Sequence, residues 1–265
     1  MKPILFTDLD GSLLDHETYS FRESKPALEL IRERQIPIIF ATSKTRTEVE
    51  LLQIEMEISE PFIIENGAAI YFPRDYRGFI INYGIRQSAY TVIRLGTEYA
   101  KIRKFVESFK GRFKIRGFGD MSAEEIASMA GLPAEQAIMA KEREFTEPFV
   151  MEDISLLMSL EDTAKERGFK ITRGGRFFHL IGEGQDKGRA VEIATEIFAE
   201  NINDKITSIG LGDSANDFTM LKCVDIPVLI PHPDGSFEDF EITSLLRAGK
   251  PGSKGWNQIV IDILK

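Results

Sequence analysis

The sequence has a single cysteine, Cys223, among its 265 residues. One cysteine can form neither an internal disulfide nor a thiolate metal cluster, which excludes disulfide-rich secreted domains and most zinc modules. The chain also lacks any apolar run near the roughly 20 residues that a membrane span requires. Its N-terminus reaches the carboxylate of Asp8 too early for a secretory signal peptide. We therefore expect a soluble, cytoplasmic protein that does not act at a membrane.

Basic residues are scarcer than acidic ones, with 33 Lys and Arg against 42 Asp and Glu and a formal net charge of −9. Binding to nucleic acid requires a basic footprint, so this balance argues against nucleic acid as a partner. The hydrophobic content of 43% and the charged content of 28% are those of an ordinary globular protein. A chain of this length forms one large domain or two moderate ones.

Short apolar runs alternate with helical patterns at both ends of the chain, which is typical of a parallel sheet with helices on both faces. We therefore predict an α/β fold in which residues 1–82 and 183–265 build one Rossmann-like, parallel-sheet core. Residues 83–182 are predicted to form an inserted α+β domain. The expected core strands span 3–9, 36–41, 61–64, 206–210 and 226–230, and the expected core helices span 24–34, 47–56, 187–199, 217–223 and 255–264.

The middle of the chain has a less regular pattern. We expect two strand-like pieces at 68–72 and 78–82, a long helix at about 89–109 and a further helix capped by Ser122. A glycine-containing turn within 169–181 predicts a β-hairpin.

Two carboxylates, Asp8 and Asp10, stand where the first buried strand ends. Ligands of open α/β sheets bind at the carboxyl ends of strands, and charged groups there are costly unless a partner neutralises them. A divalent cation such as Mg²⁺ suits carboxylate and carbonyl oxygens. The alternative is a solvated turn. Gly11 stands where an EF-hand needs another oxygen ligand, and no Walker loop occurs in the sequence.

A second acidic group, in the segment 209–217, stands at an expected strand-to-helix junction. Its Gly210-x-Gly212-x-x-Ala pattern fits a relaxed dinucleotide fingerprint, but Asp213 would face the pyrophosphate and the next strand carries no acidic residue for a ribose. We favour Asp213 as a metal ligand contributed by a second strand. Asn216 and Asp217 then lie one helical turn further on, on the same side.

Two further residues could bind an anion at the same edge. Lys187 opens a helix, where a positive charge opposes the helix dipole unless an anion is held nearby. Thr42 follows a buried strand and could donate its hydroxyl to the same anion. A solvated lysine and a helix-capping threonine are the alternative interpretations.

Taken together and in order, these pieces resemble the four motifs of the haloacid dehalogenase (HAD) superfamily of phosphotransferases, over essentially the whole chain. The insert is similar to the cap of the type IIB, Cof-like branch, and within that branch the chain resembles the mannosyl-3-phosphoglycerate phosphatase subfamily most. The superfamily motifs are Asp8-x-Asp10-Gly11-Ser12, Thr42, Lys187 and Gly212-Asp213-Ser214-x-Asn216-Asp217. The pieces that resemble the subfamily span 41–46, 64–67, 143–149 and 174–180.

The resemblance implies a Mg²⁺-dependent phosphomonoester hydrolase that releases inorganic phosphate through an aspartyl-phosphate on Asp8. Asp10 would act first as a general acid and then as a general base. Mg²⁺ would be held by the carboxylates of Asp8 and Asp213 and by the backbone carbonyl of Asp10. Thr42 and Lys187 would bind the transferring phosphoryl oxygens.

The resemblance also gives Asn216 and Asp217 the role of orienting Lys187 and metal-bound water. The substrate would be a phosphorylated sugar or a glycosyl phosphoglycerate, selected mainly by the inserted cap. No role follows for His16 or for residues 231–236. The residues that the resemblance places at or near the substrate are Lys44, Arg46, Asn66, Arg143, Glu147, Gly175, Arg176, His179 and Ser214.

Several alternatives stay open at this point. The enzyme could be another type IIB sugar phosphatase, of the glucosyl-3-phosphoglycerate or sucrose-phosphate type, or a phosphomutase. From other classes, a non-catalytic metal-binding module or a dinucleotide-binding oxidoreductase would share single motifs with this chain. The sequence leaves the oligomeric state undetermined.

Overall fold

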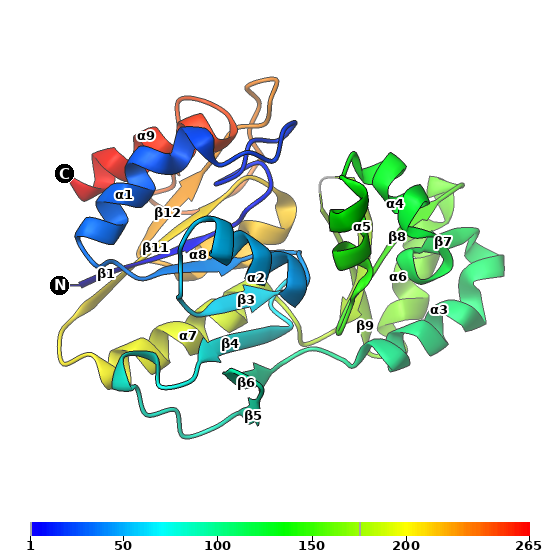
Figure 1. Ribbon diagram of the computed structural model, residues 1–265. Helices are drawn as coiled ribbons and strands as arrows, with labels where there is room; N and C mark the ends of the chain where they lie inside the picture. Colours follow the sequence, from blue (N-terminus) through cyan, green and yellow to red (C-terminus); the bar gives the residue numbers. More distant parts are fainter. Residues whose placement is uncertain (1, 175) are drawn as a thin grey trace.

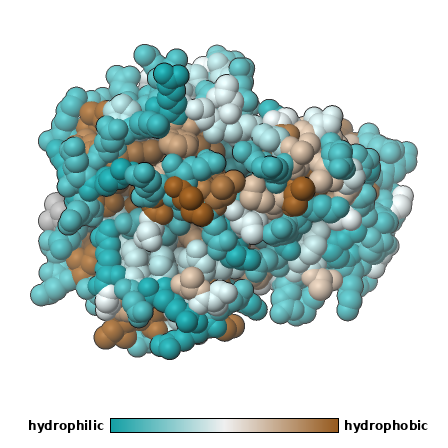
Figure 2. Space-filling view, in the orientation of Figure 1, coloured by the Kyte–Doolittle hydropathy of each residue, from teal (hydrophilic) through white to brown (hydrophobic). Residues whose placement is uncertain are grey.

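The computed structural model describes residues 2–174 and 176–265. The strands of these residues form two sheets, one of nine strands and one of four. Figure 1 shows a larger lobe that contains both termini and a smaller lobe beside it. Figure 2 shows that the viewed face of both lobes is mostly hydrophilic, with hydrophobic residues in small separate groups. The predicted α/β class is confirmed.

The larger sheet is parallel at its centre and antiparallel at one side. Its strands follow the order β13-β12-β11-β1-β2-β3-β4-β6-β5, parallel from β13 to β3 and antiparallel from β3 onward. The parallel part brings the carboxyl ends of β1, β2 and β11 to one edge. The bounds are β1 (Lys2–Thr7), β2 (Ile38–Ala41), β3 (Phe62–Ile64), β4 (Ala69–Pro73), β5 (Ile85–Gln87), β6 (Tyr90–Arg94), β11 (Ile206–Gly212), β12 (Ile226–Leu229) and β13 (Leu246–Arg247).

Helices cover both faces of this sheet, so residues 4–7 of β1 and residues 38–41 of β2 are all buried. Successive side chains of β1 enter opposite cores: Leu5 packs with the helices α1, α2 and α9, and Ile4 and Phe6 pack with α7 and α8. This alternation is the strand period of two. The bounds are α1 (Lys25–Glu33), α2 (Arg46–Glu55), α7 (Lys187–Asn201), α8 (Phe218–Cys223) and α9 (Gly252–Leu264), with short 3₁₀ turns η1 (Arg22–Ser24), η2 (Tyr76–Gly78) and η5 (Ala215–Asp217).

The smaller lobe is an antiparallel sheet in the order β7-β8-β10-β9. Helices α3 and α6 cover one face, and α4 and α5 form a second small core with Phe118 and Met121. The expected cap of α4 is confirmed, because the Ser122 hydroxyl accepts a hydrogen bond from the Glu125 amide. The bounds are α3 (Tyr99–Phe113), α4 (Ala123–Ala130), α5 (Ala134–Lys141), α6 (Leu157–Lys165), β7 (Ile115–Gly117), β8 (Glu147–Met151), β9 (Phe169–Arg173), β10 (Phe178–Gly182), η3 (Phe118–Asp120) and η4 (Ile154–Leu156).

Two predicted elements and one predicted boundary in the middle of the chain differ from the structure. The long helix begins at Tyr99 rather than near residue 89, because residues 90–94 form β6, whose Val92 and Ile93 are buried. Residues 78–82 form no strand, although Phe79 and Ile81 pack against the core of the larger lobe. Their apolar alternation reflects one-sided packing without a partner strand. Since β5 and β6 pair within the larger sheet, the segment that builds the smaller lobe begins after β6 rather than at residue 83.

Within the described residues, no helix combines the length and the apolar character needed to cross a membrane.

Candidate active site

The strand ends of the larger sheet open into a cavity of about 590 Å³ that residues of both lobes line. The larger lobe contributes Asp8 and Asp10 after β1, Lys44 after β2 and Asp213 after β11. The smaller lobe contributes Arg143, Arg176 and His179, among others. Asp8, Asp10 and Asp213 therefore line the side toward the larger sheet together with Lys44. Arg143, Arg176 and His179 line the side toward the smaller lobe.

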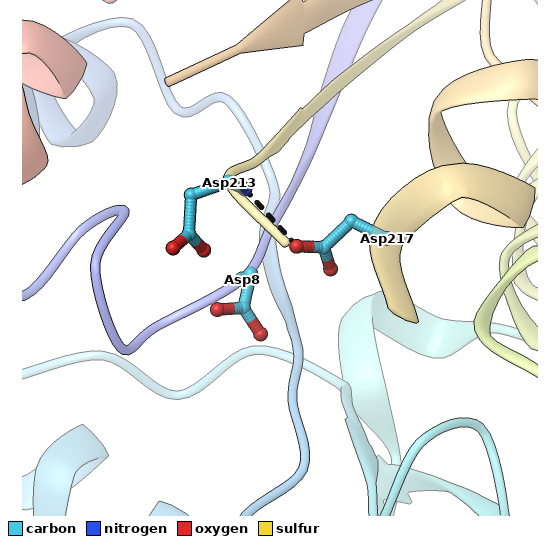
Figure 3. A group of neighbouring side chains, drawn as sticks. All are labelled: Asp8, Asp213 and Asp217. Carbon is cyan, nitrogen blue, oxygen red and sulfur yellow. Dashed lines mark hydrogen bonds between the residues drawn. The ribbon is translucent and has the colours of Figure 1, made fainter. Parts of the chain in front are cut away.

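Three carboxylates from distant parts of the chain meet at this sheet edge. Oxygen atoms of Asp8, Asp213 and Asp217 all lie within 4.8 Å of one another, and the three side chains are buried (Figure 3). The Lys187 ammonium donates to Oδ1 of Asp8 and to Oδ1 of Asp217, each at 2.6 Å. Lys187 is thus a buried ion-pair partner of the cluster and is not the solvated lysine of the alternative interpretation.

Asp217 is held in place by the backbone around it. Its Oδ2 accepts from the amides of Asp213 at 3.0 Å and Ser214 at 3.1 Å, while its Oδ1 accepts from Lys187. Both carboxylate oxygens of Asp217 are therefore engaged within the protein. Asp8 and Asp213 are therefore the better candidates for direct metal ligands.

The charges of the cluster fit a bound cation. Burial, together with the nearby carboxylates of Asp217 and Asp10, raises the pKa of Asp8 to about 7 even though Lys187 opposes this shift. Burial and the neighbouring Asp8 and Asp217 raise the pKa of Asp213 well above its usual range. Three buried carboxylates thus share one ammonium group, which leaves negative charge for a cation to balance. Carboxylate oxygens are also the ligands that a divalent cation prefers. The cluster can hold a divalent metal ion.

The loop after β1 allows Asp213 to approach closely. Gly11 has φ +78°, and a Cβ atom at this position would overlap the Asp213 carboxylate. Hydroxyl groups hold that carboxylate, with Ser12 Oγ donating to its Oδ1 at 3.4 Å and Ser214 Oγ donating to its Oδ2 at 3.0 Å. The small residues Gly11 and Ser12 therefore let two loops meet at one carboxylate.

Asp10 lies beside a buried lysine. Lys44 Nζ is 2.9 Å from Oδ1 of Asp10 and 3.7 Å from Oε1 of Glu48, and its ammonium lies 5.3 Å from the centroid of the Tyr19 ring. The Lys44 side chain is only 10% exposed, so the two carboxylates compensate for its desolvation. Lys44 is therefore fixed at the cavity wall.

Thr42 is buried at the end of β2, and its Oγ1 accepts from the Lys44 amide at 3.2 Å. The helix-cap alternative does not apply to this residue, because Thr45 caps α2 and forms a capping box with Glu48. Thr42 is not among the residues that line the cavity.

The smaller lobe presents three of its predicted substrate residues to the cavity. Arg143 donates from Nη1 to the Ser43 carbonyl at 2.7 Å, which ties it to the larger lobe. Arg176 donates to the Ala130 carbonyl. Burial and the positive charges of Arg143 and Lys187 lower the pKa of His179 to about 3, so its imidazole is neutral at physiological pH.

Two charged residues that the sequence analysis placed at or near the substrate do not line the cavity. Arg46 pairs with Glu50 and Glu144, each at 3.1 Å, where the lobes meet. Glu147 is fully buried inside the smaller lobe, with its Oε2 3.3 Å from Nη1 of Arg103. Both charges are thus neutralised by protein partners.

Three of the remaining predicted residues lie beside the acidic cluster, and one is outside the residues that the structure describes. Ser214 and Asn216 line the cavity. Asn66 does not, but its Oδ1 accepts from Asn216 Nδ2 at 2.9 Å. Gly175 lies outside the described residues.

Sequence reasoning missed several residues of the cavity wall. His16 and Tyr19 belong to the loop that follows the Asp8–Asp10 pair, and His232 and Glu238 follow the carboxyl end of β12. Their position after parallel strands was the available signal. Arg173, at the end of β9, also lines the cavity.

Comparison with known proteins identifies the family to which this chain belongs. A family model described as haloacid dehalogenase-like hydrolase matches residues 5–231. The chain belongs to this family. The match includes the strand ends that carry Asp8, Thr42 and Asp213 and the helix start that carries Lys187, and it confirms the family resemblance found in the sequence.

Curated relatives extend the similarity over the whole chain. A protein of Persephonella marina named glucosyl-3-phosphoglycerate/mannosyl-3-phosphoglycerate phosphatase is 52% identical over 98% of this chain and 97% of its own length. A protein of the same name from Methanococcoides burtonii is 42% identical over 100% of this chain and 98% of its own. The mannosyl-3-phosphoglycerate phosphatase of Pyrococcus furiosus is 33% identical over 86% of this chain and 90% of its own length. The predicted enzyme class, a phosphoric monoester hydrolase, is confirmed.

Solved structures share the fold. A Thermoplasma acidophilum protein has a TM-score of 0.70 and 20% identity and covers both chains completely. The sucrose-phosphatase of Synechocystis, solved with sucrose and phosphate, has a TM-score of 0.66 and 14% identity and covers 99% of this chain and 98% of its own. At these identities the likeness concerns the fold alone.

Proposed function

We propose that this enzyme is a Mg²⁺-dependent phosphatase of glycosyl-3-phosphoglycerates, with mannosyl-3-phosphoglycerate as substrate and the glucosyl compound as a second one. One observation carries the proposal: a single cavity has buried carboxylates on one side and the guanidinium groups of Arg143 and Arg176 on the other. Such a site can receive a phosphomonoester at one end and a carboxylate with hydroxyl groups at the other. The names of the Persephonella and Methanococcoides relatives support the same substrate class.

The first chemical step is the attack of Asp8 on phosphorus. Lys187 donates to Oδ1 of Asp8, which leaves Oδ2 to form the bond of the aspartyl-phosphate. Mg²⁺ held by Asp8 and Asp213 would offset the repulsion between the carboxylate and the phosphate group. Lys187 and backbone amides at the strand end stabilise the negative charge that spreads over the transferring oxygens.

Asp10 handles the protons of both half-reactions. As the bond between phosphorus and the glycerate oxygen breaks, Asp10 protonates that oxygen. It then takes a proton from the water that attacks phosphorus, which breaks the bond to Asp8 and releases inorganic phosphate. Its side chain is 37% exposed, so it can reach both the cavity and water. Lys44, at 2.9 Å, orients its carboxylate.

The smaller lobe decides which phosphomonoester is accepted. Arginine binds a carboxylate through two parallel hydrogen bonds, so Arg143 and Arg176 suit the glycerate carboxylate. His179 Nδ1 is buried and has no hydrogen-bond partner among the described residues. Because this imidazole is neutral, it can exchange a hydrogen bond with a sugar hydroxyl without attracting the phosphate. The lobe thereby acts as a specificity cap.

The decisive experiment measures release of inorganic phosphate from a substrate panel with either Mg²⁺ or EDTA. The panel contains mannosyl- and glucosyl-3-phosphoglycerate, sucrose phosphate, and glucose and fructose phosphates. We expect Mg²⁺-dependent turnover of the two phosphoglycerates, with kcat/KM at least about 100-fold above the other compounds, since a substrate without the glycerate carboxylate lacks the charge-assisted hydrogen bonds to Arg143 and Arg176. Comparable turnover of the whole panel would contradict the proposed substrate class. Transfer of the phosphate to another sugar hydroxyl in place of its release would indicate a phosphomutase.

A further inference from the structure

The turn between β3 and β4 contacts the loop after β2, the start of α7 and the smaller lobe, yet the proposed reaction assigns it no role. Its residues Glu65, Asn66 and Gly67 have φ values of +47°, +60° and +86°. Non-glycine residues rarely adopt this left-handed conformation, so two in a row indicate that surrounding contacts hold the turn. These contacts lead in two directions, to the catalytic loops and to the smaller lobe.

Towards the catalytic loops, the turn forms hydrogen bonds and one tight contact. The Glu65 amide donates to the Lys44 carbonyl at 3.0 Å, and the Asn66 amide donates to the Thr42 carbonyl at 2.9 Å. A Cβ atom on Gly67 would overlap the backbone of Asp186, at the start of the helix that carries Lys187. The turn is therefore built into the catalytic framework.

Towards the smaller lobe, the Glu65 carboxylate binds one short segment. Its Oε1 accepts from the Glu144 amide at 2.8 Å, and its Oε2 accepts from the Phe145 amide at 3.1 Å and from Thr146 Oγ1 at 2.6 Å. Glu65 is 0% exposed. A buried carboxylate with three donors directed at it fixes both the position and the orientation of the segment that supplies them.

The residue that precedes this segment is Arg143, which lines the cavity. We propose that Glu65 is a positioning residue for substrate recognition: by holding the amides of residues 144 and 145, it sets the Arg143 guanidinium against the substrate. This inference rests on the proposed function, because it takes the cavity as the substrate site. An apolar contact could join two lobes without the cost of burying a carboxylate, but it would not fix the direction of the Arg143 backbone.

The test compares Glu65→Gln with a milder pair of variants. Glu65→Gln keeps the shape of the side chain but turns an amide NH₂ group toward hydrogen-bond donors. Thr146→Val removes only the hydroxyl contact, whereas Thr146→Ser retains it and should behave as the wild type. Glu60→Gln is the matched control, since Glu60 is a partly buried carboxylate of the larger lobe that pairs with Arg77, away from the cavity.

Two substrates separate recognition from chemistry. With mannosyl-3-phosphoglycerate, we expect Glu65→Gln to raise KM at least about tenfold with kcat within about twofold, and Thr146→Val to raise KM less. With p-nitrophenyl phosphate, which lacks the glycerate group, kcat/KM should stay at the wild-type value. Equal losses on both substrates would show a merely structural role, and an unchanged KM would also overturn the proposal.

Amide hydrogen exchange provides a readout that does not depend on the substrate. The amides of Glu144 and Phe145 should exchange faster in Glu65→Gln than in the wild type, while Glu60→Gln leaves them unchanged. Unchanged exchange at both positions would overturn the proposal. If the wild type hydrolyses p-nitrophenyl phosphate but none of the phosphoglycerates, the proposed substrate class fails, and hydrogen exchange still decides whether Glu65 holds the segment. If Glu65→Gln does not fold, the Thr146 pair supplies both measurements.

Discussion

Replacing Lys187 by methionine should destabilise the metal-free enzyme far more than an ordinary surface substitution. The Lys187 side chain is 0% exposed, and its ammonium lies 2.6 Å from carboxylate oxygens of both Asp8 and Asp217. Methionine has a similar length and fills the same space without the charge. Removing one partner of a buried ion pair costs about 3–5 kcal/mol, because the other charge stays buried and uncompensated.

A bound cation should recover part of this loss. Without Lys187, the carboxylates of Asp8, Asp213 and Asp217 have no ammonium group among them, so a divalent ion at Asp8 and Asp213 becomes their main source of positive charge. We therefore expect Mg²⁺ to raise the free energy of unfolding more in Lys187→Met than in the wild type. Asp8→Asn/Lys187→Met should be less destabilised than Lys187→Met alone, since it removes one of the uncompensated charges.

The assay is urea unfolding in EDTA and in Mg²⁺, followed by the fluorescence of the single tryptophan, Trp256. Trp256 is fully buried, and its indole Nε1 donates to Thr7 Oγ1 at 2.9 Å, in the residue before Asp8. Phosphate release should fall at least about 100-fold, because the transferring oxygens lose a charged donor. A Lys187→Met variant with the wild-type urea midpoint in EDTA would refute the reasoning, because the lysine would then not be compensating buried charge.

Three further predictions concern single residues. Asp8→Asn should abolish measurable phosphate release. Its urea midpoint should stay at or above the wild-type value, since the variant removes a carboxylate from a crowded cluster. Residual turnover above 1% of wild type, which corresponds to an activation barrier raised by less than roughly 3 kcal/mol, would contradict the role of Asp8 as nucleophile. Arg143→Ala should raise KM for mannosyl-3-phosphoglycerate at least about tenfold and leave KM for p-nitrophenyl phosphate unchanged; equal effects on both would contradict a role in binding glycerate. Because His179 has a pKa of about 3 in the folded protein against a usual value of 6.5, the unfolded chain binds its proton first as the pH falls. The free energy of unfolding should therefore decrease below pH 6.5 by up to about 1.4 kcal/mol per pH unit. The urea midpoints measured at pH 7 and pH 5 should differ less in His179→Gln than in the wild type.

The sequence predicted the acidic side of the site because that side depends on local rules. Asp8 and Asp213 each follow an apolar strand, and Lys187 begins a helix, so their positions along the chain could be recognised from short patterns. Parallel strands then place their carboxyl ends at one edge, whatever the length of chain between them. Residues some two hundred positions apart could thus be assigned to one cluster without knowledge of the intervening fold.

The middle of the chain could not be predicted in the same way. Residues 90–94 carry apolar and β-branched side chains next to the helix-forming segment that begins at Tyr99, and the two patterns merge into one apparent helix. The pairing of β6 with β4 and β5 decides the outcome, and it is a tertiary contact. Helix α5 was missed because its exposed Ile138 and its short length weaken the periodic signal.

The cap side of the site shows why charge alone does not identify a binding residue. Arg143 and Glu144 are adjacent, yet Arg143 lines the cavity while Glu144 pairs with Arg46 between the lobes. Glu65, which anchors their backbone, is an acidic residue in a turn and gives no sign in the sequence that amides 80 positions away will meet it. Whether a charged side chain meets the substrate is therefore set by how the two lobes dock. That docking depends on buried hydrogen bonds such as those of Glu65, which is why a substitution remote from the phosphate should alter recognition of the substrate and leave the chemistry intact.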